Sequence, residues 1–187
     1  MSNVDRVNGL RPVRHLDGSP YNGAANTYFI PASDNTAVFI GDAVKSAGSA
    51  DADGVATVAQ AAAGEAIRGV VVGVKPVTAE SPIYREASTA RYVMVADAPD
   101  LVFEVQEDAV GGALAATDVG NNADLVVGSG STATGRSGME LDSSTKATST
   151  AQLRIIGFAQ RPDNEIGDNA KVLVTINEHE LKSTTGV

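Results

Sequence analysis

The chain contains no cysteine and no tryptophan, and aromatic residues make up only 4% of its 187 residues. Without cysteine there can be no disulfide framework and no thiolate metal site, so the redox compartment is left undetermined. Because aromatic side chains bury the largest areas, their scarcity leaves the core to Val, Ala, Ile and Leu. We therefore expect one domain with appendages and a core of modest strength, to which neighbouring subunits contribute stability.

Long hydrophobic runs are also missing. Nowhere do about 18 apolar residues follow one another, the length that a membrane-spanning helix requires. The first ten residues contain no apolar run of signal-peptide length. These observations predict a soluble, unexported chain without a membrane partner.

Positive charge is scarce in the middle of the sequence. The chain has a formal net charge of −9, yet residues 1–16 carry +2, which leaves −11 on the remainder. Residues 92–135 contain no Lys or Arg and seven acidic side chains. An acidic surface of this kind repels phosphate backbones, so we expect no nucleic-acid partner.

No constellation of catalytic residues can be recognised. His15 and His179 are the only histidines, and neither an H-E-x-x-H nor a G-x-S-x-G motif occurs. Hydrolase or metalloenzyme chemistry would need residues that no motif places together. We therefore expect a protein that is not an enzyme and that has no cofactor.

Two short motifs and one acidic stretch are better explained by turns and surface than by ligands. Residues 128–133 match G-x-G-x-x-A, but a segment rich in Thr and Gly follows them, where a dinucleotide site needs a helix. Residues 51–54 resemble the start of a calcium loop without its terminal Glu, which favours a hairpin turn. The acids around Glu104, Glu107 and Asp108 favour a solvated face, with a cation between subunits left open.

Alternation of apolar residues predicts strands throughout the chain. Residues 91–96 and 101–107 flank the turn sequence DAPD, which predicts a hairpin near the centre of a sheet. Further strands are predicted at residues 27–30, 36–40, 55–59, 66–74, 125–127, 139–141, 152–160 and 171–177. The predicted fold is all-β, a small β-barrel or β-sandwich, spanning residues 27–187.

The remaining segments are predicted to be an arm, loops and a tail. Residues 1–26 form an extended N-terminal arm that must lie on its own domain, on a neighbouring subunit or on a partner. Residues 75–90 form a projecting loop whose Ile83 and Tyr84 need cover. For residues 108–117, a short helix is one of two open alternatives. Residues 128–138 are predicted to form a flexible loop, and the tail from residue 178 is expected to fray.

Several blocks of the sequence together resemble the cement or head-decoration proteins of tailed bacteriophages. None of them is a chemical motif, so the resemblance rests on overall similarity across most of the chain. The blocks are residues 8–23 (NGLRPVRHLDGSPYNG), 87–95 (ASTARYVMV), 111–120 (GGALAATDVG), 130–145 (GSTATGRSGMELDSST) and 160–167 (QRPDNEIG).

The resemblance implies a virion protein on the outside of the expanded phage head, made in the cytoplasm of the bacterial host. Its partner would be the major capsid protein, whose subunits it clamps together. Charge asymmetry adds the hypothesis that Arg6, Arg11 and Arg14 dock on acidic capsid surface, while the β domain forms a trimer or dimer. The alternative is a virion surface module that binds host glycan or protein through residues 75–90, including Ile83 and Tyr84, or residues 128–138.

Overall fold

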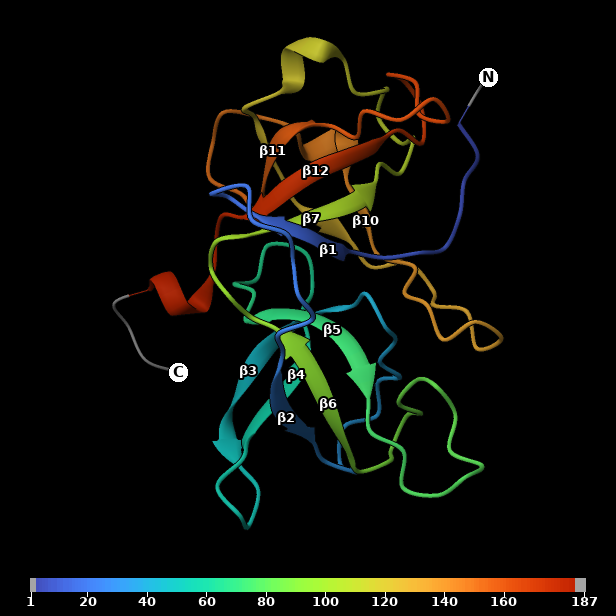
Figure 1. The fold of residues 1–187 in the computed structure, drawn as a ribbon, viewed down its shortest axis with the longest axis vertical. Helices are drawn as coiled ribbons and strands as arrows, with labels where there is room; N and C mark the ends of the chain where they lie inside the picture. Colours follow the sequence, from blue (N-terminus) through green and yellow to red (C-terminus); the bar gives the residue numbers. More distant parts are fainter. Residues whose placement is uncertain (1–2, 184–187) are drawn as a thin grey trace.

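The computed structural model describes residues 3–183 and is built almost entirely from β-strands (Figure 1). Five strands close into a barrel in the order β2-β4-β3-β5-β6, and five others form an open sheet in the order β1-β7-β12-β11-β8. A short pair, β9 with β10, forms a separate two-stranded sheet. The predicted all-β class is confirmed, and the barrel is one of its two main parts.

The strands are short, as expected for a chain rich in Gly and turn residues. Those of the barrel are β2 (Asn26–Ile30), β3 (Ala43–Ala50), β4 (Ala56–Gln60), β5 (Gly69–Val74) and β6 (Arg91–Ala96). Those of the open sheet are β1 (Arg11–His15), β7 (Leu101–Gln106), β8 (Asn122–Ala123), β11 (Leu153–Phe158) and β12 (Lys171–Ile176). The pair consists of β9 (Leu125–Val126) and β10 (Glu140–Leu141).

Helical structure among residues 3–183 is confined to three single 3₁₀ turns. They are η1 (Ala116–Asp118), η2 (Ser143–Thr145) and η3 (Glu180–Lys182). Across the described part of the chain, no helix has the length and apolar character that crossing a membrane requires.

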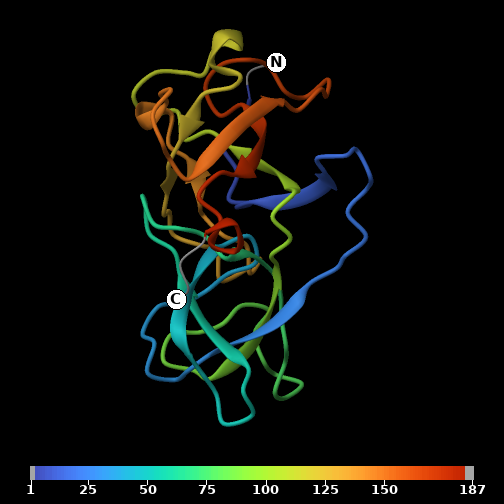
Figure 2. The same cartoon turned by 90° about the vertical axis from the view of Figure 1, so that its left-hand side faces the viewer.

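The barrel and the open sheet are stacked along the long axis of the molecule (Figures 1 and 2). Small aliphatic side chains fill the barrel, including Val44, Val58 and Val93, each of which is buried. A second cluster runs from Val70 of the barrel to Phe103 of the open sheet. Because this second cluster contains residues of both parts, the barrel and the open sheet are packed against each other through it.

The predicted hairpin of residues 91–107 is wrong, although both of its strands exist. β6 pairs with β2 and β5 inside the barrel, whereas β7 pairs with β1 and β12 in the open sheet. The turn between them connects the two parts of the molecule. Asp97 accepts a hydrogen bond from Tyr28 Oη of the barrel, and Asp100 lies 3.0 Å from His15 Nδ1 of the open sheet. Asp97 is therefore bonded to the barrel and Asp100 to the open sheet, so β6 and β7 diverge instead of pairing.

The hairpin turn predicted at residues 51–54 is confirmed. It joins the antiparallel strands β3 and β4, and the Asp51 carboxylate accepts hydrogen bonds from the backbone N–H groups of Asp53 and Val55. Gly54 has a φ of +81°, a conformation that glycine adopts without strain. The carboxylate thus acts as a local cap for the turn.

Two local predictions do not hold, and the short helix left open at residues 108–117 is not formed as such. Residues 36–40 form only isolated bridges, from Val38 to Arg85 and from Ile40 to Arg136, rather than a strand. Residues 108–117 contain no helical turn before Ala116, because glycines 111 and 112 have φ values of +81° and +103°. The tail is ordered as far as residue 183, since His179 is 3% exposed; residues 184–187 lie outside the described part.

Candidate functional site

A groove of about 440 Å³ runs between the N-terminal arm and the open sheet. Five cationic side chains line it, against two carboxylates, those of Glu104 and Asp163. The charge balance of its lining is therefore positive although the chain as a whole is acidic. We call this feature the basic groove and define it by Arg6, Arg11, Arg136, Arg161 and Lys171.

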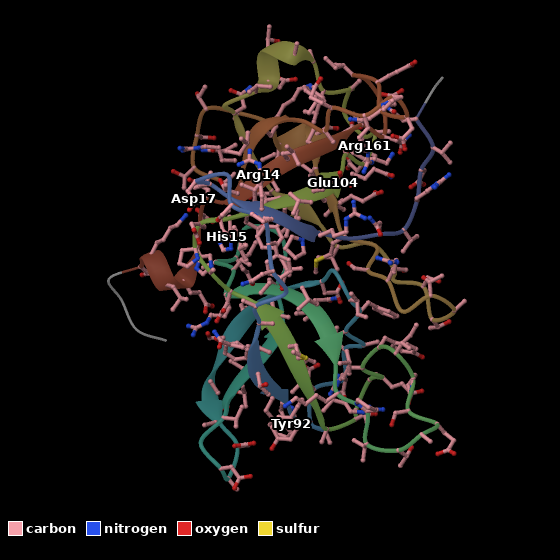
Figure 3. All side chains as sticks on the ribbon, in the orientation of Figure 1. Arg14, His15, Asp17, Tyr92, Glu104 and Arg161 are labelled. Atoms are coloured by element: carbon pink, nitrogen blue, oxygen red, sulfur yellow. The ribbon has the colours of Figure 1, made fainter. Side chains whose placement is uncertain are left out.

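Glu104 of β7 fixes two of these cations in place. Its side chain is 9% exposed, and it accepts hydrogen bonds from Arg11 Nη2 at 3.0 Å and from Arg161 Nη1 at 3.0 Å. Arg161 Nε also lies 3.3 Å from Asp163 Oδ1. Figure 3 shows Glu104 and Arg161 side by side on the open sheet. Two guanidinium groups thus share one nearly buried carboxylate, which holds them in defined orientations.

Strand alternation explains how the groove receives its polar side chains. Phe103 and Val105 of β7 belong to the hydrophobic core, so the intervening Glu104 and the following Gln106 project to the opposite face. Lys171 of β12 lies directly opposite Gln106 in the register of the sheet. At this end of β7 and β12, charged and polar side chains therefore lie on one face of the sheet and apolar side chains on the other.

The other cations come from loops. Arg136 belongs to the segment 128–138, and its Nη1 donates a hydrogen bond of 3.0 Å to Asn8 Oδ1 of the arm. The Ser131 and Arg136 backbones form a bridge, so this segment doubles back on itself. Among the described residues 3–183, Arg6, Arg136 and Lys171 have no carboxylate within 4.0 Å, whereas Arg11 and Arg161 do. The first three are the groups most free to meet an outside anion.

The arm lies on its own chain, the first of the three locations left open by the sequence. Asn3 Nδ2 donates to the backbone oxygens of Glu165 and Asp168, and the Arg6 backbone N–H donates to Gln106 Oε1 at 3.1 Å. Residues 11–15 of the predicted arm are strand β1, paired with β7. The boundary at residue 26 between arm and β domain stays a prediction.

The five residues predicted to bind a partner lie in three separate places. Arg6 and Arg11 line the basic groove, but Arg14 does not, and its Nη1 donates to the backbone oxygen of His15. Ile83 and Tyr84 belong to the loop 75–90 beside the barrel (Figure 1). The structure therefore brings together two of the three arginines and separates the apolar pair from them.

The loop 75–90 is covered in part by the barrel. Tyr84 stacks on Phe39 with ring centroids 4.8 Å apart and planes 13° from parallel. Ile83 remains 53% exposed and lies against Gly135, where a Cβ atom would approach its side chain to 2.4 Å. The two predicted contact loops, 75–90 and 128–138, are thus neighbours.

Sequence reasoning missed Arg136, Arg161 and Lys171. Arg136 lies in the predicted flexible loop, Arg161 in a connection rich in turn residues, and Lys171 at the first position of a strand. No local motif relates them to the arm. Glu104 was considered for a cation site, whereas it pairs with arginines. Within residues 3–183, no group of three His, Asp or Glu side chains is arranged to hold a metal ion.

A second polar cluster lies between the barrel and the C-terminal turn. Tyr28 Oη donates to Asp97 Oδ2 at 2.6 Å and accepts from Arg68 Nε at 2.9 Å. His179 is buried beside this cluster, and its Nδ1 accepts a hydrogen bond from the Leu181 N–H. Burial, with a smaller contribution from nearby Lys182, lowers the pKa of His179 to about 4. This cluster fastens the two parts of the molecule together.

Comparison with known proteins found no matching family model, no matching curated protein and no matching solved structure. The resemblance to head-decoration proteins therefore stays a prediction. The basic groove and the surfaces around it are the features that bear on the function of the chain. That geometry suits binding of an acidic partner, because it concentrates cations on one face without a converging set of acid and base groups.

Proposed function

We propose that this chain is a structural virion protein that decorates the outside of a phage head and stabilises contacts between major capsid subunits. The observation that carries the proposal is the basic groove, five cations gathered on one face of a chain whose net charge is −9. A protein that works by adhesion needs a surface complementary in charge to its partner. The groove supplies such a surface for acidic side chains of the capsid.

The groove would act through groups that are already positioned. Glu104 orients Arg11 and Arg161, whose side chains stay partly exposed, so they can bind with little further loss of side-chain freedom. Arg6 and Lys171 add charge at the rim. Charge-assisted hydrogen bonds from guanidinium to carboxylate are stronger than neutral ones. A row of Asp or Glu side chains on a capsid protein would satisfy all of these donors.

The structure alters the docking hypothesis for the arm. Residues 11–15 are part of a sheet, so the arm would bind the capsid while remaining attached to its own domain. Arg14 contributes to a different surface. Self-association into a trimer or dimer would use other faces, and Val77, at 74% exposed, and Ile166, at 55%, are apolar side chains available for it.

A second candidate function has its own supporting observation. The loops 75–90 and 128–138 touch through Ile83 and Gly135, which creates a joint surface next to the Tyr84–Phe39 stack. A virion module that binds host glycan or protein would present such loops, since aromatic rings stack on sugar faces. The ring face of Tyr84 is used internally, however, which leaves less aromatic surface for a sugar.

Sedimentation of the purified protein with empty heads distinguishes these functions. Wild-type protein should pellet with heads, and the double variant Arg136→Glu, Lys171→Glu should pellet at least tenfold less, because two attractions become repulsions. Arg154→Glu, at an exposed position of β11 outside the groove, is the matched control. Failure of the wild type to bind heads, or equal binding by the double variant, would remove the proposal.

A further inference from the structure

The side-chain amide of Gln106 is one of the contacts that hold the arm in place, beside those of Asn3 and the strand pairing of β1. Gln106 Nε2 donates hydrogen bonds to Asp5 Oδ1 at 2.8 Å and to Glu140 Oε1 at 2.7 Å. Its Oε1 accepts the backbone N–H of Arg6 at 3.1 Å. One residue of β7 therefore connects the arm with strand β10 through both the NH₂ group and the oxygen of its amide.

The two carboxylates are brought close to one another by this arrangement. Both accept hydrogen atoms of the same NH₂ group, so their oxygens lie roughly 5 Å apart. Two carboxylates at that separation resist being ionised together. Burial, followed by the charge of Asp5, raises the pKa of Glu140 to about 7. Below pH 7, Glu140 is therefore mostly neutral, and above pH 7 it is mostly ionised.

The backbone next to the amide is strained. Glu107 follows Gln106 and is fully buried, and its Oε1 has no hydrogen-bond partner, while Oε2 accepts the Asn169 N–H at 2.7 Å. Ala109 and Asn169 have φ values of +56° and +55°, two of the three non-glycine residues with positive φ among residues 3–183. Such strain persists where the surrounding structure enforces it, and it concentrates at switches and binding sites.

The charges that face Glu140 come from several elements. Asp5 lies on the arm, and Glu107 and Asp108 follow β7, so three carboxyl groups disfavour ionisation of Glu140. On the cationic side, Lys171 of β12 lies opposite Gln106, and the backbone of Arg6 binds the same amide. A proton on Glu140 removes one of these negative charges and so relieves the repulsion.

We propose that Asp5, Gln106 and Glu140 form a proton-dependent latch for the N-terminal arm. With Glu140 protonated, Gln106 bridges one carboxylate and one neutral acid, and residues 3–8 stay on the sheet. As the proton leaves Glu140, two carboxylates face each other across the amide, and the arm loosens. Asp5 is exposed and lies on the arm, whereas Glu140 belongs to strand β10, so in this proposal it is the arm that moves.

The latch has a consequence for the basic groove, and this step rests on the proposed function. The arm supplies Arg6 and Asn8 to the groove, and Asn8 accepts a hydrogen bond from Arg136. Loosening the arm removes Arg6 from the lining and frees Arg136 from its hydrogen bond with Asn8. Binding to an acidic partner should therefore weaken as the pH rises through 7.

Hydrogen exchange of the free protein tests the latch without any partner, so failure of head binding would leave this test intact. The protection factor of the Arg6 amide, corrected for intrinsic exchange, is measured from pH 5.5 to 8.5. For wild type it should fall about tenfold with a midpoint near 7, the effect of one pKa unit of coupling. Glu140→Gln, which stays neutral, should keep the arm protected at every pH.

The controls separate the latch from general loosening. Asp163→Asn removes a carboxylate on the other side of the groove and should retain the wild-type midpoint. The carboxyl carbon of Glu140, followed by NMR in the wild-type protein, should titrate near 7. A protection factor independent of pH, an unchanged midpoint in Glu140→Gln, or titration of Glu140 near 4.5 would each overturn the latch.

Discussion

Glu104 and Arg161 are 57 residues apart in the sequence, and Arg161 Nη1 donates to both oxygens of the Glu104 carboxylate, at 3.0 and 3.2 Å. Glu104 projects from a strand whose other face is core, and Arg161 comes from the connection between β11 and β12. Both residues line the basic groove. Their contact links the stability of the open sheet to the surface that we propose meets the capsid.

Replacing Glu104 by Gln should weaken both the fold and the groove. The change leaves Arg11 and Arg161 without their shared carboxylate, and because both arginines are partly exposed, the expected loss is only about 1–2 kcal/mol of unfolding free energy. Urea unfolding measures it. Asp163→Asn, at an exposed carboxylate of the same groove, should stay within about 0.5 kcal/mol of wild type. Equal losses in the two variants would show that Glu104 has no special role.

Arg85 should be among the most sensitive positions of the barrel end. Its side chain is 0% exposed, and its guanidinium donates to the backbone oxygens of Thr36, Pro31, Asp34 and Thr89. Arg85→Ala removes donors from several buried oxygens at once, with an expected loss of about 3 kcal/mol or more.

Lysine cannot reproduce the planar arrangement of Arg85, so Arg85→Lys should recover only part of that loss. Thermal or urea unfolding gives the values, and exchange of amides in residues 31–36 and 85–90 locates the damage. Arg154→Ala, at an exposed arginine, is the control. A loss for Arg85→Ala below about 1 kcal/mol would contradict the role assigned to this side chain.

The hydroxyl of Tyr28 should matter for the junction of barrel and sheet. Tyr28 is 5% exposed, and its hydroxyl donates to Asp97 and accepts from Arg68. Tyr28→Phe keeps the ring and leaves the Asp97 carboxylate short of a donor, which should cost about 1–3 kcal/mol. Tyr92→Phe removes a hydroxyl that binds the only partly buried Asp51 and should cost less. A larger loss of stability for Tyr92→Phe than for Tyr28→Phe would refute this role of the Tyr28 hydroxyl.

Acid should destabilise the protein through His179. Because its folded-state pKa is lowered to about 4, the unfolded chain binds a proton more readily below its ordinary value of 6.5. Stability should therefore fall as the pH decreases from 6.5 to 4. His179→Asn preserves an acceptor for the Leu181 N–H but does not titrate, so its stability should fall less over this range. Parallel pH profiles for the two proteins would argue against buried neutral His179.

The sequence predicted those features of the fold that depend on neighbouring residues. Alternation located β6 and β12 within one residue of their observed ends, since side chains of a strand alternate whatever its partner. The turn at residues 51–54 was predictable because Asp51 binds backbone groups only two to four positions away.

Pairing between strands could not be predicted in the same way. The DAPD turn has suitable residues for a hairpin, but Asp97 and Asp100 are bound by side chains about 70 and 85 residues distant in sequence, which only the folded chain brings near. β1 was missed because Pro12 and a register shift between Pro12 and Arg14 interrupt its alternation.

The candidate site was predictable only in part for the same reason. Arg6 and Arg11 were identified from the concentration of charge at the front of the chain. Arg136 and Lys171 follow no periodicity that relates them to the arm, and they reach the groove because β12 pairs with β7 and the segment 128–138 binds Asn8. Buried Arg85 was missed because its partners are backbone oxygens, which leave no sequence signal.

The account depends most on the basic groove being the surface that meets the capsid. An image reconstruction of heads carrying the bound protein, at a resolution that shows side chains, tests this directly. We predict that Arg6, Arg136 and Lys171 face acidic side chains of major capsid subunits across a junction. A reconstruction in which the groove opens to solvent while the loops 75–90 and 128–138 contact the head would contradict it.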